Sequence, residues 1–234
     1  VETRGVETNP LGLGVGPRFD NWRGAARPQR QSLIGRTCRL DPLVPSHAAG
    51  LVAAYAHDTT GANATYLAFG PFSDAPALEA FILEGLRGPD RFFAITKTDE
   101  PDPVGFGSYM RIQPQDGSIE IGNLYFAPAL QRTTAATEAI YLMIAHAFDA
   151  LGYRRVEWKC NALNAPSKTA ALRFGFTFEG VFRQATVSRG RSRDTAWYSI
   201  TDGEWPGLAT RFRAWLSPEN FDPKGAQIRR LDEI

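Results

Sequence analysis

The stretch IEIGNLYFAPALQRTTAATEAIYLMIAHAFDALG, residues 119–152, decides the fold. Apolar residues alternate from Ile119 to Phe126 but change phase at Gly122 and Asn123, which predicts a strand with a bulge. After a loop of small residues, apolar positions recur at helical spacing over 140–151, and Gly152 ends the helix. The predicted order is therefore strand, tight loop and helix.

The start of this helix is a candidate anion site. A helix N-terminus that follows a loop of small residues leaves several backbone N–H groups without partners, and they point in one direction. Together with the helix dipole, such groups can hold a pyrophosphate. Most junctions of this kind bind nothing. From this stretch alone, the junction can be interpreted either as an ordinary connection or as a ligand site.

Composition limits the class of protein. The 234 residues are enough for one sizeable domain, and 43% hydrophobic with 22% charged residues is typical of a globular chain. A net charge of +1 gives no general case for binding DNA or an anionic membrane. Cys38 and Cys160 form no metal-ligand spacing, so we expect no metal site and two reduced thiols. Without a long apolar run or a secretory leader, we expect a cytoplasmic protein.

The rest of the chain alternates between the two periodicities. We expect an N-terminal extension over 1–31, a main domain over 32–206, and a C-terminal helix and tail over 207–234. Further strands are predicted at 33–43, 91–97, 104–112, 155–160, 176–187 and 195–200. Further helices are predicted at 45–57, 74–87, 166–174 and 205–216. This order predicts an α/β (α+β) fold whose sheet of about seven strands is mixed and mostly antiparallel, with helices on its faces.

Four segments, in this order, resemble the GNAT (GCN5-related N-acetyltransferase) superfamily, specifically its ribosomal-protein N-terminal acetyltransferase branch. They are IEIGNLYFAPALQRTTAATEA, LGYRRVEWKC, NALNAPSKTAALRFGFTFEG and RGRSRDTAWYSITDGEWP, and the resemblance covers about residues 33–206. It implies that the strand before the loop splays away from the strand Arg155 to Cys160, and that acetyl-CoA lies in the resulting V. A pantetheine arm carries amides that can pair with the open strand edge, at Leu124 to Ala127.

The resemblance also implies which residues hold the cofactor. Asn164 resembles the asparagine that bonds the pantetheine arm, although it also stands where a helix turn begins. The family's pyrophosphate loop corresponds to Gln131–Ala136. The full predicted cofactor-binding set is Leu124, Tyr125, Phe126, Gln131, Arg132, Thr133, Thr134, Ala135, Ala136, Thr137, Asn164 and Ser167.

The loop departs from the family pattern at two positions. Thr134 and Ala136 stand where the family usually has glycine, which permits positive φ and close backbone approach. Small residues still allow that approach if the local φ stays negative. A hydroxyl at Thr134 also offers one more donor to a phosphate.

Few side chains are candidates for chemistry. Glu120, just before the proposed acetyl position, is the best candidate for the general base, with Glu157 and Asp194 as alternatives. A mechanism without a dedicated base stays open, because proximity alone supplies much of the rate. Many relatives use a tyrosine as the acid where Ala171 stands here. Ser167 matches the serine of the ribosomal-protein branch and is the predicted proton donor, unless it only caps its helix.

Three functions are weighed. The leading one is an acetyl-CoA-dependent N-acetyltransferase whose acceptor is a protein N-terminus or a small amine. The second is a non-catalytic module that binds acyl-CoA, suggested by the changes at Thr134, Ala136 and Ala171. The third is an adaptor for RNA or the ribosome, which would act through the arginines at 183–193. A homodimer stays open.

Overall fold

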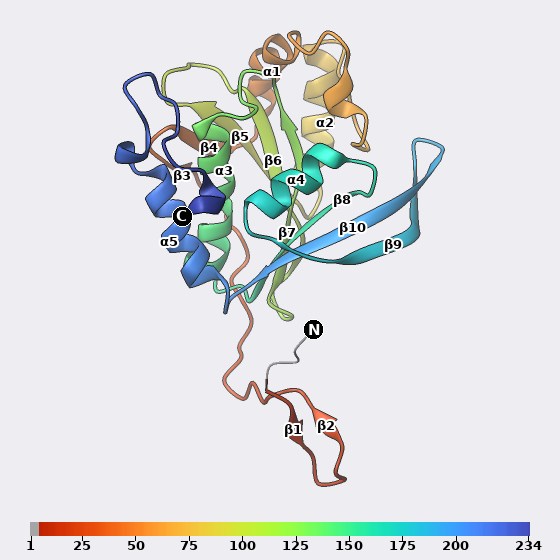
Figure 1. Cartoon of the computed structure of the whole chain (residues 1–234). Helices are drawn as coiled ribbons and strands as arrows, with labels where there is room; N and C mark the ends of the chain where they lie inside the picture. The colour runs from red at the N-terminus through yellow and green to blue at the C-terminus, as the bar shows by residue number, and fades with distance from the viewer. Residues whose placement is uncertain (1–4) are drawn as a thin grey trace.

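A computed structural model describes residues 5–234. It is organised around one eight-stranded sheet in the order β3-β4-β5-β6-β7-β8-β10-β9, drawn in Figure 1. Neighbouring strands are antiparallel except β7 and β8, which are parallel. The strands are β3 (Leu33–Ile34), β4 (Cys38–Pro42), β5 (Arg91–Lys97), β6 (Gly105–Gln113), β7 (Ser118–Phe126), β8 (Arg155–Asn161), β9 (Thr177–Ser188) and β10 (Arg191–Thr201).

The mixed, mostly antiparallel α+β architecture confirms the predicted fold class. The sheet has one strand more than expected, because the segment predicted as a single strand at 33–43 turns at Gly35 and pairs with itself as β3 and β4. The last two strands form a long hairpin that extends beyond the rest of the sheet and curls at its tip (Figure 1).

Five α-helices lie against the sheet, and local capping explains where several begin. They are α1 (Ala48–Tyr55), α2 (Ala75–Arg87), α3 (Thr134–Ala145), α4 (Ala165–Arg173) and α5 (Trp205–Leu216). The N–H of Ala77 donates to the Asp74 carboxylate at 2.8 Å, as expected for an N-cap. A single π-helical turn over His146–Ala150 extends α3 before Gly152, whose φ is +74°.

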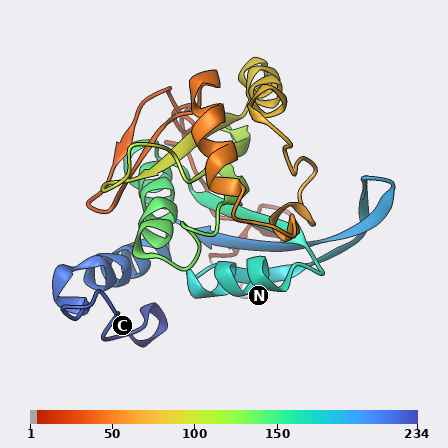
Figure 2. The same cartoon turned by 90° about the horizontal axis from the view of Figure 1, so that it is seen from above.

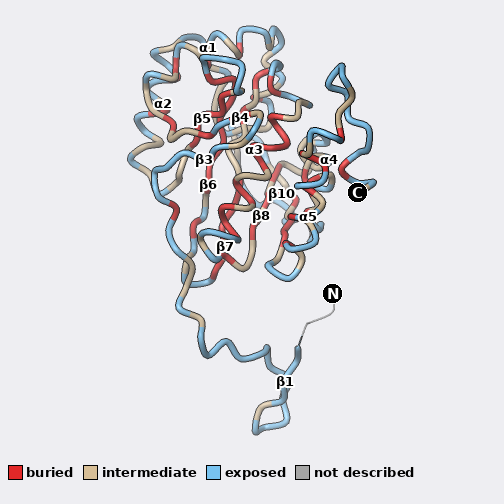
Figure 3. Tube along the Cα trace, turned by 90° about the vertical axis from the view of Figure 1, so that its left-hand side faces the viewer, coloured by how far each residue is buried: buried red, intermediate tan, exposed pale blue. Residues whose placement is uncertain are grey.

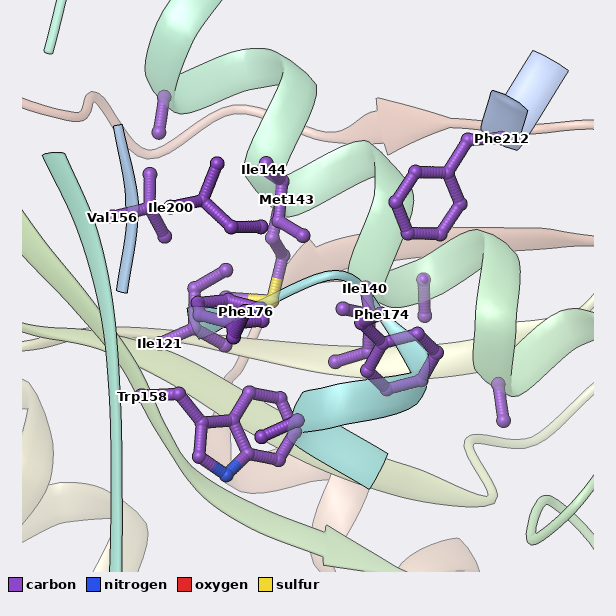
Figure 4. Close-up of a cluster of buried hydrophobic side chains, with 14 of the residues drawn as sticks. Ile121, Ile140, Met143, Ile144, Val156, Trp158, Phe174, Phe176, Ile200 and Phe212 are labelled. Atoms are coloured by element: carbon purple, nitrogen blue, oxygen red, sulfur yellow. The ribbon is translucent and has the colours of Figure 1, made fainter. Parts of the chain in front are cut away.

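Two hydrophobic cores cover the two faces of the sheet. The larger core joins α3, α4 and α5 to one face, and Figure 4 shows Met143, Trp158 and Phe212 within it. The smaller core joins α1 and α2 to the other face through Phe106 and Tyr125. Figure 2 shows α1 and α2 on their own side of the sheet, opposite α3. Because α5 shares the larger core with α3, residues 207–216 are integral to the fold.

The N-terminal segment forms an arm beside the main body. It carries a small hairpin of β1 (Glu7–Thr8) and β2 (Gly14–Val15), which Figure 3 shows as an exposed lobe. The indole N–H of Trp22 donates to the Gln115 carbonyl oxygen at 2.6 Å and fixes the base of the arm. The guanidinium of Arg154 lies 4.0 Å from the Phe19 ring centroid. The arm is therefore held near the β6–β7 turn.

The first turn of α3 is fixed by a buried carboxylate. Glu138 accepts the backbone N–H groups of Arg36 and Thr37 at 2.9 and 2.6 Å, and the Thr37 hydroxyl at 2.5 Å. A Cβ added at Gly35 would lie 2.6 Å from the Glu138 Cδ atom, so this turn needs glycine for close approach. The β3–β4 turn and the start of α3 are therefore joined as one unit.

A buried histidine lies at the other end of α3. The Tyr109 hydroxyl donates its one proton to the Met143 carbonyl oxygen at 2.6 Å, so His146 Nδ1, 3.2 Å away, is the donor to Tyr109. His146 Nε2 then accepts from the Gln31 amide nitrogen at 3.0 Å. The imidazole is therefore neutral, and burial lowers its pKa.

This arrangement predicts a loss of stability in mild acid. Because the folded-state pKa of His146 lies below its unfolded value of about 6.5, the unfolded chain binds more protons as the pH falls through that value. The free energy of unfolding is expected to fall between pH 7 and pH 5. His146→Gln should make this decline shallower, as measured by urea unfolding at each pH.

The exposed His57 supplies the control, since His57→Gln should keep the slope of the parent protein. Burial also lowers the pKa of His47, so some slope should remain in the His146 variant. An identical pH dependence in His146→Gln and the parent would contradict the assignment.

Candidate active site

The sheet opens between β7 and β8. These strands pair only at Ser118 with Arg155, Ile119 with Val156 and Glu120 with Glu157. Beyond that point β7 continues to Phe126 along β6, and β8 continues to Asn161 along β10. The facing edges of β7 and β8 are therefore unpaired with each other, as the resemblance to the family implies.

The predicted bulge lies on the β7 side of the split. Ser108 of β6 pairs with Gly122, whereas Phe106 pairs with Tyr125, so β7 contains one extra residue between these pairs. Asn123 occupies the bulge with φ of +52°, a conformation that asparagine tolerates better than most residues. The bulge turns the backbone of residues 124–126 relative to the start of the strand.

Part of the β7 edge already has partners inside the protein. The Tyr55 hydroxyl donates to the Tyr125 carbonyl oxygen at 2.6 Å, and the Tyr125 side chain lies in the smaller core. The Phe126 carbonyl oxygen accepts from the Asn63 and Gln131 side chains at 3.3 and 2.9 Å. Leu124 is half-buried on the same segment. Of the three predicted β7 residues, Tyr125 and Phe126 therefore offer a ligand fewer backbone acceptors than expected.

The predicted phosphate loop leads into α3. Some of its backbone N–H groups have hydrogen-bond acceptors within the protein and others do not. The N–H groups of Gln131 and Thr133 donate to the carbonyl oxygens of Ala127 and Leu130. The Ala136 N–H donates to the Thr133 hydroxyl oxygen at 3.1 Å, which makes Thr133 the N-cap. The amides of Arg132, Thr134 and Ala135 make no hydrogen bond to any of residues 5–234. Three of the six loop amides thus have internal partners and three do not.

The backbone φ angles explain why this loop does not need glycine at positions 134 and 136. Thr134 and Ala136 belong to α3 and have helical backbone, so neither position needs positive φ. The single positive φ within the loop falls at Arg132, at +61°. Ala135 and Ala136 are buried, and the Thr137 hydroxyl accepts from the Arg173 guanidinium at 3.1 Å. This last contact joins the start of α3 to α4.

The loop is also tied to the segment between α1 and α2. The Gln131 amide donates to the Asn63 side-chain oxygen at 2.7 Å and to the Phe126 carbonyl oxygen. The predicted cofactor loop and the 58–72 loop, on the other face, are therefore linked through one side chain.

The beginning of α4 holds the other two predicted residues. Asn164 is the N-cap, because its side-chain oxygen accepts the Ser167 N–H at 3.1 Å. Ser167 is inside the helix, where its hydroxyl oxygen accepts the Trp158 indole N–H at 3.0 Å. This bond leaves the hydroxyl proton of Ser167 available for another acceptor. Burial raises the pKa of the nearby Cys160 thiol.

Glu120 lies at the point where the strands separate, within a chain of alternating charges. Its Oε2 atom accepts from Arg111 at 2.6 Å and from Lys159 at 3.0 Å. Lys159 also contacts Glu157 at 2.6 Å, and Arg155 joins Glu157 to Glu179. The chain spans β6 to β9 and includes Lys159, whose side chain is only 5% exposed.

The two predicted catalytic residues lie on opposite faces of the sheet. Ile119 and Ile121 belong to the larger core, so Glu120 between them points to the other face. Trp158, which holds Ser167, is in the larger core, whereas its neighbour Lys159 meets Glu120 on the opposite side. A ligand in the split would therefore meet Ser167 from one face and Glu120 from the other.

The alternative bases are less suited to accept a proton. Burial alone would raise the pKa of Glu157, but Lys159 and Arg155 outweigh burial and hold this pKa below its ordinary value. Asp194 is occupied by the Gln184 N–H, which donates to it at 2.7 Å. Glu120 shares Oε2 between two cations, and no hydrogen bond from residues 5–234 reaches its Oε1 atom.

Sequence reasoning missed several residues that shape the site. Lys159 was recognised as part of a strand, but its central position between two carboxylates depends on pairing across the sheet. Tyr55, Asn63 and Arg111 reach the site from distant segments. Among residues 5–234 there is no cluster suited to a metal ion and no helix long and apolar enough to cross a membrane.

The central lysine generates a prediction about stability. Lys159→Met removes the cation shared by Glu120 and Glu157, each of which keeps one arginine, and should cost about 1–3 kcal/mol in free energy of unfolding. Lys97→Met removes a more exposed ion pair with Glu100 and should cost less than about 1 kcal/mol. Denaturant unfolding of both variants measures the difference, and equal losses would contradict a structural role for the charge chain.

Comparison with known proteins agrees with this geometry. A family model described as "Acetyltransferase (GNAT) domain" matches residues 38–177. A crystal structure titled as a GCN5-related N-acetyltransferase from Brucella melitensis is 42% identical, with a TM-score of 0.89, and covers 92% of this chain and 98% of that chain. A probable GNAT-family acetyltransferase from Chromobacterium violaceum ATCC 12472 is 38% identical, with a TM-score of 0.77, over 85% of this chain and all of that one.

Among curated proteins, ribosomal-protein-serine acetyltransferase from Escherichia coli (strain K12) is 34% identical over 99 residues. That match spans 42% of this chain and about half, 54%, of the relative. The family model covers more than half of the chain, and it includes the split strands, the predicted phosphate loop and α4. The chain therefore belongs to the GNAT N-acetyltransferase family.

Proposed function

We propose that this protein transfers an acetyl group from acetyl-CoA to a primary amine, either a protein N-terminus or a small amine. The reaction is direct attack within a ternary complex: the amine nitrogen forms the new C–N bond, the C–S bond of the thioester breaks, and the amine loses a proton. The observation that carries the proposal is the loss of pairing between β7 and β8 after Glu120 and Glu157. An open pair of strand edges in the middle of a sheet needs a ligand to complete its hydrogen bonding.

On the proposed cofactor side, the start of α3 supplies the groups for the diphosphate. The free amides of Arg132, Thr134 and Ala135 lie at the positive end of the helix dipole. Positive φ at Arg132 lets the chain enter the helix without glycine at Thr134 or Ala136. The pantetheine arm would lie along β7 from Leu124, with Asn164 on the α4 side. Acetyl-CoA supplies the activated thioester.

Ser167 is the proposed proton donor to the leaving sulfur. Its oxygen accepts from Trp158, which orients the hydroxyl and leaves its proton unused by that bond. The backbone N–H groups after the bulge at Asn123 are the proposed donors to the developing oxyanion. Because this donor belongs to the backbone, substitution of a single side chain would not remove it.

The acceptor amine is proposed to enter from the opposite face, where Glu120 lies. Glu120 is the proposed base through its Oε1 atom, while Oε2 stays with Arg111 and Lys159. Those two ion pairs also hold the carboxylate in place and limit its movement toward an amine. Its part in the reaction is therefore expected to be modest, with most of the rate coming from the positioning of amine and thioester.

The proposal is tested by two measurements on the purified full chain. Calorimetric titration with acetyl-CoA should show binding, and release of the free thiol should depend on an added amine. Binding without thiol release across a broad amine panel would instead identify a non-catalytic module. If acetyl-CoA does not bind, the proposed function is wrong.

Ser167→Ala should separate chemistry from binding. Because the hydroxyl acts on the leaving group, kcat should fall about tenfold to a hundredfold, while the Kd for acetyl-CoA stays within about twofold. Thr169→Ala is the matched control, since Thr169 is exposed on the same helix. An unchanged kcat in Ser167→Ala would exclude this serine from the mechanism.

A further inference from the structure

A cavity of about 410 Å³ lies between the N-terminal arm and the main body, where α2 ends and β5 begins. Cavities of about this size hold small organic ligands in proteins. The lining includes four charged residues, Arg27, Arg30, Asp90 and Arg91, and the apolar part of the wall includes Phe92 and Phe93. None of the lining residues belongs to the predicted cofactor-binding set.

The cavity is separate from the split between β7 and β8. Arg91, at the start of β5, pairs with Tyr109 of β6, which pairs with Ile121 of β7. Ile121 precedes the bulge, whereas the β7 residues proposed to meet the cofactor follow it. Arg27 and Arg30 also precede residue 38, where the family match begins. The arm thus adds charged groups that the matched family domain does not contain.

The arm is fixed where it forms the wall of this cavity. Pro28 is buried, and the backbone N–H of Ala26 donates to the Leu151 carbonyl oxygen at 2.8 Å. On the other side of Pro28, the Gln31 amide nitrogen bonds His146 Nε2 at 3.0 Å. Both contacts attach the arm to the helical segment that follows α3. The backbone that carries the two arginines is therefore held in place.

The opposite wall is ordered by its own contacts. The Arg91 guanidinium donates to the carbonyl oxygens of Pro89 and Asp90, each at 3.1 Å, and so fixes the turn after α2. The Leu43 N–H donates to the Phe92 carbonyl oxygen at 3.0 Å. The cavity therefore lies between two segments that are each anchored to the body of the protein.

The charges of the lining are not neutralised within the protein. Arg27, Arg30 and Arg91 form no ion pair with a carboxylate of residues 5–234. The half-buried Asp90 carboxylate is in no ion pair of that part of the chain either. Burial raises the pKa of Asp90, and Arg111 and Arg91 offset only part of the rise. Three guanidinium groups and one carboxylate leave an excess of two positive charges.

This set of groups selects a phosphate monoester with a hydroxylated body. A phosphate monoester carries a charge of about −1.5 to −2 at pH 7, which matches the excess positive charge. Guanidinium groups bind phosphate oxygens with good geometry. The Asp90 carboxylate accepts hydrogen bonds, and acidic side chains bind sugar hydroxyls in this way. A metal cation would be repelled by the three arginines, and a zwitterionic amino acid would leave the excess charge unmatched.

We propose that this cavity binds a sugar phosphate ester, with Arg27, Arg30 and Arg91 on the phosphate and Asp90 on the sugar hydroxyls. Free sugar phosphates and nucleoside monophosphates share this chemistry. The site shares no residue with the proposed acetyl-transfer site, so the two proposals stand or fall separately.

Calorimetric titration of the purified full chain tests the class of ligand. Ribose 5-phosphate and AMP should both bind, with a Kd of about 1 mM or tighter, and AMP should bind at least about tenfold more tightly than adenosine. Similar Kd values for the two phosphates identify the sugar phosphate as sufficient, whereas a much tighter AMP identifies a nucleotide. Failure of both phosphates to bind, or tighter binding of a free amino acid such as leucine, would overturn the proposal.

A second titration separates the cavity from the proposed cofactor site, because AMP resembles part of CoA. In saturating acetyl-CoA the Kd values for ribose 5-phosphate and AMP should stay within about twofold of those without it. Loss of both in the presence of acetyl-CoA would assign them to the cofactor site and overturn the cavity proposal. If acetyl-CoA itself does not bind, the proposed function is wrong, and the variants below still test the cavity.

Arg30→Gln tests the phosphate contact. The side chain is exposed, so the variant should fold normally, and the Kd for ribose 5-phosphate should rise about tenfold. Arg18→Gln is the matched control, because it removes the same charge from an exposed position on the same arm and should leave the Kd unchanged. An equal Kd in Arg30→Gln and the parent would overturn the assigned phosphate position.

Asp90→Asn tests the sugar contact. The parent should bind ribose 5-phosphate more tightly than inorganic phosphate, and this preference should shrink about fivefold in the variant. The melting temperature of the free protein should stay the same or rise, because burial disfavours the charge that is removed. A purely structural carboxylate would instead lower the melting temperature.

Asp99→Asn supplies the control for this variant, since Asp99 is exposed in the turn between β5 and β6. It should keep the parent's preference for ribose 5-phosphate. The same preference in Asp90→Asn as in the parent would exclude Asp90 from the sugar contact and overturn the proposed ligand class.

Discussion

The separation of β7 from β8 is the constraint on which the rest of the structure depends. Three parallel pairs hold the two strands together, and the last of them brings together Glu120 and Glu157. Two carboxylates side by side would repel each other, and Lys159 lies between them, with Arg111 and Arg155 at the outer ends. The charge chain therefore stabilises the apex of the V at the place where hydrogen bonding between the strands ends. Above the apex, the two halves of the sheet are held by different partners.

Each half of the split has its own support. On one side, Glu138 fixes the start of α3 to the β3–β4 turn, which keeps the unpaired amides in a defined direction. On the other side, Trp158 joins β8 to α4 through Ser167. Arg173 connects α4 back to the first turn of α3. These contacts hold the elements on both sides of the split in fixed positions, which is what a preorganised binding site requires.

Much of the fold could be predicted because its signals are local. Alternation over 119–126, the Asn123 irregularity and the helical period after the loop together indicated the bulged strand and α3. The turn at Gly35 was missed, because its reason is a carboxylate 103 residues later in the chain. The predictions of cofactor-binding residues came from the motifs of the family resemblance. The ion pairs of Glu120 depend on pairing across the sheet, which no single segment encodes. The Asn164 cap is local, because its partner is the N–H of Ser167 three residues later.

The side chain of Gln131 connects two regions that would serve different ligands. It donates to Asn63 in the loop after α1 and to the last carbonyl oxygen of β7, and Gln131 is also the first residue of the predicted phosphate loop. A ligand that moves the Gln131 amide on one face of the sheet would change the free energy of ligand binding on the other face. Thermodynamic linkage is reciprocal: if the first ligand changes the affinity for the second by some factor, the second changes the affinity for the first by the same factor. If the loop and the split bind separate ligands as proposed, the Gln131 side chain is a contact that both binding regions share.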